Sequence, residues 1–85
     1  AVASQARSTV EEALSRPTLS RRHAEAIARV TDRDGLRDLH VRALGRLAAD
    51  NPDDPAIALR QAEALRQAGR FEEAARAYRR VLDGR

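Results

Sequence analysis

The segment from residue 55 to residue 82 constrains the fold most, because two amphipathic patterns in it flank a single glycine, Gly69. Before the glycine, apolar residues recur at intervals of three and four and share one helical face. They are Ile57, Ala58, Ala62, Leu65 and Ala68. After it, the pattern continues with Phe71, Ala74, Ala75, Tyr78, Val81 and Leu82. Glycine accepts the left-handed conformation that ends a helix, so the segment predicts two antiparallel helices joined by a short turn.

Large and small side chains alternate in this hairpin, which allows close approach of the two backbones. We therefore expect Ala74 and Ala75 to pack between the helices and Tyr78 to be a buried aromatic side chain. Phe71 and Tyr78 are the only aromatic residues of the chain. No helix that follows in the sequence can cover the far side of Phe71, Tyr78 and Val81, and this edge is where we expect something else to pack.

Three more helices are predicted before this hairpin. Residues 3–15 form the first, which ends before Pro17 because the residue before a proline is driven out of the helical region. It begins either near Val2 or only at Thr9, and we favour the longer helix. Residues 18–32 form the second, with Thr18 or Ser20 as the N-cap. Its apolar positions, together with His23, are expected to pack.

The third helix is expected from residue 36 to about Asp50, with Asp34 as its N-cap. A turn-rich connector follows at residues 51–55, in which Pro52 ends the third helix. Asp54 is expected to cap the fourth helix, and Pro55 to occupy the first helical position, where the missing N–H costs nothing. Five helices then account for nearly all of the chain.

Internal repetition supports a repeat architecture, because Gly35 and Gly69 stand 34 residues apart. In the 55–82 segment Ala62 and Leu65 occupy the small and large sites of a first helix, and Ala74 and Tyr78 the small and aromatic sites of a second. This pattern resembles the tetratricopeptide repeat (TPR) family, whose repeat closes with a proline as Pro52 does here. Ala58, Gln61, Thr31 and His40 depart from the pattern, and we expect His40 to be a half-buried packing residue.

The resemblance implies an all-α fold in which antiparallel helical hairpins stack as a right-handed superhelix. It divides the chain into a degenerate half repeat at residues 1–17, a repeat at 21–54 and the best-formed repeat at 55–85. Because the chain begins with Ala1, we expect a domain excised from a longer repeat protein or a processed product. The alternative is an unrelated antiparallel bundle of five helices.

In the TPR family the first helices line a concave groove that holds another polypeptide, so the resemblance implies a protein-interaction scaffold. The positions carried onto this face are Arg22, Glu25, Arg29, Asp32 and Arg33, with Ala56, Leu59, Glu63, Arg66 and Gln67 one repeat later. One interpretation is that Arg22, Arg29 and Arg66 bind carboxylates of an acidic or C-terminal peptide through their guanidinium forks. The other is that Arg29 with Glu25, and Arg66 with Glu63, are solvated pairs on one helix.

Composition excludes several other classes of function. The 16 basic residues are all arginine and the 13 acidic residues are interspersed among them, which is typical of a salt-bridged helical surface. There is no cysteine and no His/Cys/Glu cluster, phosphate loop or nucleophile motif, so we expect no metal, cofactor, small-molecule substrate or enzymatic activity. No apolar run is long enough to enter a membrane. We expect a soluble bacterial protein, and the sequence leaves cytoplasm and periplasm open.

Two further functions remain as alternatives. The segment can be a structural spacer whose exposed terminal helices self-associate. Residues 19–48 can also be interpreted as a helix-turn-helix that binds nucleic acid, with an arginine-rich face made of Arg29, Arg33, Arg37, Arg42 and Arg46. The sequence disfavours nucleic acid, because the start of the predicted recognition helix has neither Asn nor Gln to contact bases.

Overall fold

Five helices follow one another in the computed structural model, which describes residues 2–83 and, of residues 2–4 and 6, the backbone alone. They are α1 (Val2–Leu14), α2 (Arg21–Arg33), α3 (Arg37–Asp50), α4 (Pro55–Gln67) and α5 (Phe71–Asp83). The all-α class and the predicted five helices are confirmed, and α1 has the longer of its two predicted extents. The predicted half repeat at residues 1–17 and the predicted repeat at 55–85 extend to residues 1, 84 and 85, which lie outside the described residues.

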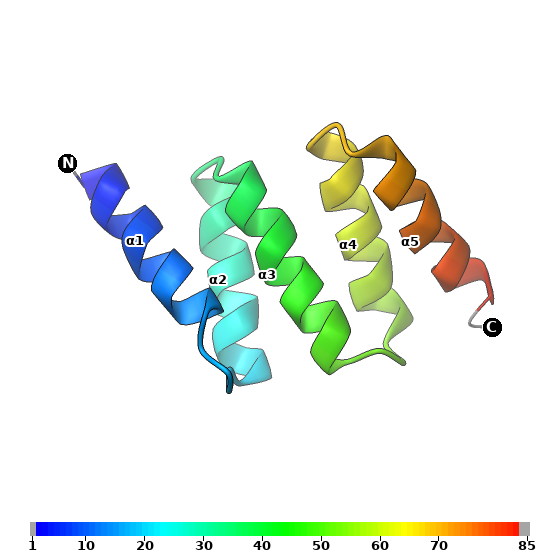
Figure 1. The fold of residues 1–85 in the computed structure, drawn as a ribbon, viewed down its shortest axis with the longest axis horizontal. Coiled ribbons are helices and arrows are strands. Elements are labelled where there is room, and N and C mark those ends of the chain that lie inside the picture. The colour runs from blue at the N-terminus through cyan, green and yellow to red at the C-terminus, as the bar shows by residue number, and fades with distance from the viewer. Residues whose placement is uncertain (1, 84–85) are drawn as a thin grey trace.

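The helices lie side by side in a row, with principal extents of 43, 27 and 17 Å (Figure 1). α2 packs against α3, α3 against α4 and α4 against α5, so each of these neighbours in sequence is also a neighbour in space. α1 packs on α3 as well. α3 therefore contacts three other helices and is the centre of the domain, whereas α5 contacts α4 and forms one end of the row.

The two hairpin turns each have a glycine in the left-handed region, as predicted for Gly69. Gly35 has φ +71° between α2 and α3, and Gly69 has φ +79° between α4 and α5. L-residues with a Cβ rarely adopt such angles. These two glycines therefore allow a sharp turn directly after α2 and after α4, so that the next helix runs in the opposite direction.

The hydrogen bonds of the two turns are also equivalent. The N–H of Leu36 donates to the carbonyl of Thr31 at 2.9 Å, and the N–H of Arg70 donates to the carbonyl of Leu65 at 2.9 Å. Both bonds span the glycine and satisfy a carbonyl in the last turn of the preceding helix. The two donors, like the two acceptors, are 34 residues apart, so the period seen in the sequence recurs in the main-chain hydrogen bonding.

Helix starts agree with the predicted caps in two of three cases. The Ser20 side chain accepts from the N–H of His23 at 3.2 Å, and Pro55 is the first residue of α4 behind the cap Asp54. The prediction that Asp34 caps α3 is wrong. Leu36 occupies that position without a side-chain hydrogen bond, and Asp34 is the C-cap of α2. Asp34 lies in the turn that closes α2, two residues before the N-cap position of α3.

The core is built mainly from aliphatic side chains of α3. The largest fully buried side chains are Leu39, Leu44, Leu47, Ile57 and Thr31. Alanines at the helix contacts allow close packing, and the buried ones include pairs one period apart, Ala28 with Ala62 and Ala43 with Ala77. The hydrophobic centre therefore lies between the two hairpins rather than within the 55–82 hairpin alone.

Several packing predictions for the hairpin helices are wrong. In α5, Ala74 is buried as predicted, but Ala75 is exposed and Ala77 is buried instead. Tyr78 is only half-buried, and Phe71 is 67% exposed. The physical reason is that α5 contacts α4 on one side only, so the other side of its apolar pattern stays in solvent. In α2, His23 is exposed, because its position faces away from α3.

α1 is tied to the rest of the domain through the side chains of two arginines. Arg7 in α1 donates to the carboxylate of Asp38 in α3. Arg46 in α3 donates to three main-chain carbonyls where α1 ends, those of Leu14, Arg16 and Pro17, at 3.2, 2.6 and 2.9 Å. Main-chain carbonyls at and beyond a helix end have no helical partner, so one guanidinium satisfies three of them.

The start of α4 is expected to make stability depend on pH. The pKa of Asp54 is lowered from its usual 3.8, chiefly by the hydrogen bond from the N–H of Ile57 and further by Arg21 and the N–H of Ala56, against partial burial. Because the folded state lowers this pKa, its contribution to stability is fully present above the unfolded-state pKa and is lost as pH falls through the folded pKa. We expect Asp54→Asn, which keeps an acceptor at the cap, to flatten the acid limb of the stability curve.

The measurement is urea unfolding followed by circular dichroism between pH 2 and pH 7. Asp53→Asn is the matched control, since Asp53 is the neighbouring exposed carboxylate and forms no ion pair among residues 2–83. If the free energy of unfolding falls equally steeply at acid pH in Asp54→Asn and in the unsubstituted chain, the Asp54 carboxylate does not contribute to the pH dependence of stability.

Candidate functional site

A groove runs between α2 and α4, with α3 as its floor, and we call it the α2–α4 groove. Two cavities of about 190 and 220 Å³ lie along it. They share four lining residues, Asp32, His40, Ala64 and Gln67. The two cavities are therefore neighbouring parts of one depression bounded by the first helix of each hairpin.

Three of the predicted partner-binding residues line this groove. Arg29 comes from α2, and Glu63 and Gln67 come from α4. Asp32, which the same helical face predicted, lines it as well. The remaining predicted residues line neither cavity. They are Arg22, Glu25, Arg33, Ala56, Leu59 and Arg66.

An ion pair joins the two walls of the groove. Arg60 in α4 donates to the carboxylate of Glu25 in α2 at 2.7 Å, and both side chains are partly buried. One of the two interpretations of the sequence paired Glu25 with Arg29 on its own helix, and that pairing is not the one that forms. No sequence signal indicated Arg60, since the partners are 35 residues apart and meet only because α2 and α4 flank the same side of α3.

The floor of the groove contains a histidine held by a buried threonine. Nδ1 of His40 lies 3.0 Å from the hydroxyl oxygen of Thr31, which also lies 2.9 Å from the carbonyl of Ile27 and 3.0 Å from that of Ala28. A hydroxyl donates once, and the carbonyls only accept. These contacts are satisfied when Thr31 donates to a carbonyl and accepts from Nδ1–H of His40. Nε2 is then the acceptor of this half-buried ring, whose predicted half-burial is confirmed.

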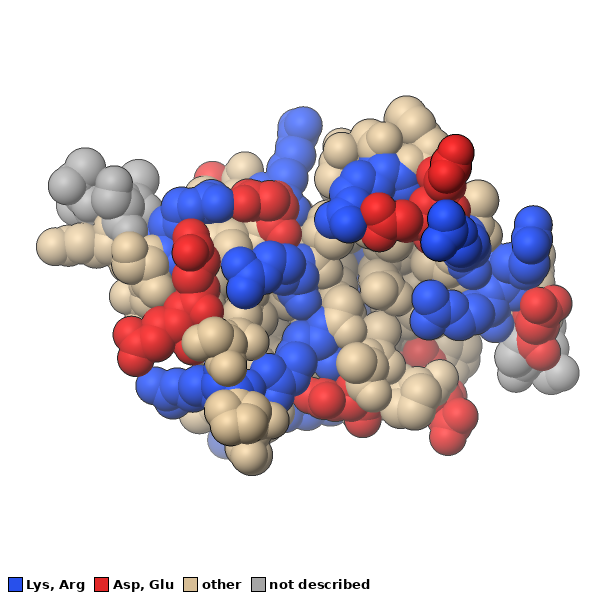
Figure 2. All heavy atoms as spheres, viewed as in Figure 1, with Lys and Arg blue, Asp and Glu red and all other residues tan. Residues whose placement is uncertain are grey.

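The arginines on either side of the groove differ in how they are paired. Arg33 lies 3.3 Å from the carboxylate of its neighbour Asp34. Arg22, Arg29 and Arg66 are exposed and form no ion pair within the described part of the chain. Figure 2 shows that positive and negative side chains alternate over one face of the molecule. This face therefore carries interspersed charges of both signs rather than one continuous basic patch.

The five arginines of the nucleic-acid alternative are engaged differently from one another. The guanidinium group of Arg46 is bound within the domain, since it donates to carbonyls of the α1–α2 connector and to the carboxylate of Asp50 at 3.2 Å. Arg33 is paired with its neighbour, and Arg29 lies in the groove. Arg37 and Arg42 are exposed on α3.

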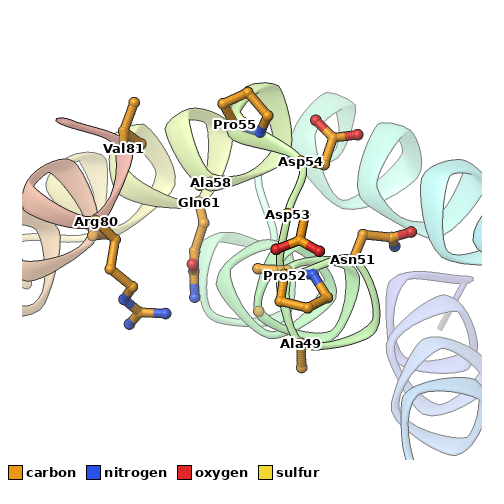
Figure 3. A pocket seen from close by; sticks show the side chains of 13 residues that line it. Ala49, Asn51, Pro52, Asp53, Asp54, Pro55, Ala58, Gln61, Arg80 and Val81 are labelled. Carbon is orange, nitrogen blue, oxygen red and sulfur yellow. The ribbon is translucent and has the colours of Figure 1, made fainter. Parts of the chain in front are cut away.

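A larger cavity of about 510 Å³ lies between α3 and α5 near the start of α4, and the sequence did not predict it (Figure 3). Small side chains leave this space open, because Gly45, Ala48, Ala58 and Ala77 line it. In the view of Figure 3, Gln61 lies between Arg80 on one side and Asp53 of the connector on the other. The lining is mainly apolar and carries no buried charge.

Metal and membrane sites are absent from the part of the chain that the structure describes. No three His, Cys, Asp or Glu side chains within residues 2–83 come together to hold a metal ion. No helix in the same range is long and apolar enough to cross a bilayer. Comparisons with protein-family models, curated proteins and solved structures gave no significant match to this chain.

Proposed function

We propose that this chain is a protein-interaction module of the TPR type, in which the α2–α4 groove binds an acidic, extended segment of another protein. The observation that carries the proposal is the groove itself, which has the unpaired Arg29 on its α2 wall and two shallow cavities along its floor. The stacked, right-handed superhelix that the family forms is part of this proposal.

The equivalence of the two hairpins supports the repeat assignment. The turn hydrogen bonds recur at the 34-residue period, and so do buried positions, for example Thr31 with Leu65. A bundle of unrelated helices has no reason to repeat the same donor, acceptor and glycine at one spacing. A repeat protein does, because each unit buries its faces against its neighbours in the same way.

The size of the cavities supports an extended polypeptide rather than a small molecule. Pockets for small molecules usually measure about 300 to 1,000 Å³ and enclose most of their ligand. Each groove cavity is smaller and open, which suits single side chains of a peptide that lies along the groove. Gln67 offers an amide to the main chain of such a peptide, and Nε2 of His40 offers an acceptor.

Charge supports an acidic partner whose carboxylates are spaced apart. A guanidinium group binds a carboxylate through two parallel hydrogen bonds, and Arg29 and Arg66 have no partner of their own among the described residues. Asp32 and Glu63 line the groove together with Arg29 and repel a continuous run of acids. The preferred peptide therefore alternates acidic with small or apolar residues.

The test is fluorescence anisotropy with a labelled peptide that alternates Asp or Glu with Ala and Ser. Arg29→Glu and Arg66→Glu are each expected to weaken binding about tenfold, because a favourable pair becomes a repulsive one. Arg42→Glu is the matched control, since Arg42 is exposed on the opposite face of α3 from His40. Circular dichroism should be unchanged in all three variants.

Two outcomes would count against the groove. If Arg42→Glu weakens binding as much as Arg29→Glu, the peptide responds to net charge and not to the groove. If a lysine-substituted peptide binds as well as the acidic one, the proposed chemistry is wrong. For specific binding we expect affinity to fall with added salt, because exposed charges are screened.

A further inference from the structure

One side of α5 carries a regular apolar stripe that the fold leaves in solvent. The stripe consists of Phe71, Ala75, Tyr78 and Leu82, at successive spacings of four, three and four, and we call it the α5 seam. Phe71 is 67% and Leu82 is 63% exposed, Ala75 is exposed and Tyr78 is half-buried. Spacing of this kind keeps residues in line along a helix and is the pattern with which two helices pair.

Apart from Tyr78, which is half-buried against the core, the seam is separate from the surfaces that hold the domain together. α5 packs on α4 through Ala74 and Ala77, which are both buried and lie on a neighbouring side of the helix. No seam residue lines either cavity of the α2–α4 groove. Whatever covers the seam therefore leaves both the core and the groove as they are.

Charges beside the seam form a self-complementary pattern. Glu72 follows Phe71 at the start of α5, and Arg79 follows Tyr78 near its end, so both flank the seam on the same side. The Glu72 side chain is 94% exposed, and its contact with Arg76 is long, at 3.9 Å. Arg79 forms no ion pair with any of residues 2–83. An acid at one end and a base at the other match a second α5 that runs in the opposite direction.

We propose that the α5 seam binds a second copy of this chain, with the two α5 helices antiparallel about a two-fold axis between Ala75 and Tyr78. In this arrangement Phe71 meets Leu82 of the second copy, and Ala75 meets Tyr78, so a large side chain faces a smaller one in each layer. Glu72 of each copy lies beside Arg79 of the other, so the two-fold axis generates two such pairs. A parallel pair would instead place Glu72 and Arg79 of one copy on the opposite side of the interface from Glu72 and Arg79 of the other, so these charges would not meet.

The expected dimer is weak because the interface is short. A helix of 13 residues is about 20 Å long, so a single pair buries an area at the lower end of specific interfaces. We expect a dissociation constant on the order of 100 µM. Two-fold pairing uses the same surface on both copies, which closes the assembly at two and leaves both grooves open.

Sedimentation equilibrium from roughly 10 µM to 1 mM tests the proposal. The unsubstituted chain should change from monomer to dimer over this range. Leu82→Glu should raise the dissociation constant at least tenfold, whereas Leu59→Glu, the same change at an exposed leucine of α4, should leave it unaltered. Tyr78 is the only tyrosine and there is no tryptophan, so intrinsic fluorescence should report the same transition.

A charge exchange separates the antiparallel pair from other arrangements. Glu72→Arg alone and Arg79→Glu alone should each weaken the dimer, because like charges then meet across the axis. The double variant Glu72→Arg with Arg79→Glu should restore it, since opposite charges meet again. The proposal is overturned if the chain stays monomeric up to the highest concentration. The seam would then bind another protein or a following helix instead of a second copy. The proposal is also overturned if the chain forms assemblies larger than a dimer, or if the double variant dimerises no more tightly than the single variants.

Discussion

Replacing Gly69 with proline is expected to unfold the α4–α5 hairpin, which makes it the most damaging single change we predict. Gly69 has φ +79°, whereas the proline ring holds φ near −65°. Proline also removes the N–H that donates to the carbonyl of Arg66 at 3.0 Å. The turn cannot form with this residue, and we expect a loss of about 3 kcal/mol or more in the free energy of unfolding. Circular dichroism in urea should show lower helicity even without denaturant.

Gly69→Ala is the control that isolates the backbone angle. A Cβ at this position meets no atom within 4 Å, so alanine adds the strain of positive φ alone, about 1 kcal/mol. The same pair of substitutions at Gly35, which also has open space around it, should rank in the same order. If proline and alanine at position 69 destabilise the chain equally, the left-handed turn does not limit folding.

Leu39→Ala is expected to remove a large share of the total stability. Leu39 is 0% exposed in the first turn of α3, where its side chain belongs to the core shared by the two hairpins. Leucine-to-alanine changes at such positions cost about 3 to 5 kcal/mol, through lost burial and the cavity left behind. A domain of 85 residues has about 4 to 13 kcal/mol in total. Urea unfolding should therefore show a much lower midpoint with an unchanged slope.

Leu59→Ala is the matched control for this prediction, since the same side chain is removed from a position that is 40% exposed. Its cost should stay below about 1 kcal/mol. Tyr78→Ala should fall between the two, because Tyr78 is half-buried against the core. A cost for Tyr78→Ala above that of Leu39→Ala would mean that the C-terminal hairpin, and not α3, organises the fold.

The groove and the seam assign different surfaces of one small domain to different partners. Arg29 and Gln67 belong to the groove, and Phe71 and Leu82 belong to the seam on α5. A variant such as Leu82→Glu should therefore abolish dimerisation while peptide binding persists. Conversely, Arg29→Glu should weaken peptide binding in a chain that still dimerises, so failure of either proposal leaves the other open to test.

Features that depend on near neighbours in the chain were predictable. Helix positions follow from periodicity, the two turns from Gly35 and Gly69, and the start of α4 from Asp54 and Pro55. Each of these involves atoms within a few residues of one another, so the local sequence contains the required information. Half of the groove wall was also predictable, because the register of the resemblance to the TPR family assigned Arg29, Asp32, Glu63 and Gln67 to this face.

By itself, the sequence determined five helices, their caps in two of three cases and a 34-residue period. Only the tertiary structure decided which apolar residues are covered, because exposure depends on the helix that lies opposite. α3 is contacted on several sides and buries Leu39, whereas α5 is contacted by α4 and leaves Ala75 and Phe71 in solvent. The same holds for the pair of Arg60 with Glu25 and for the bonds from Arg46 to the α1–α2 connector. Those partners lie about thirty residues apart, and only helix packing brings them together.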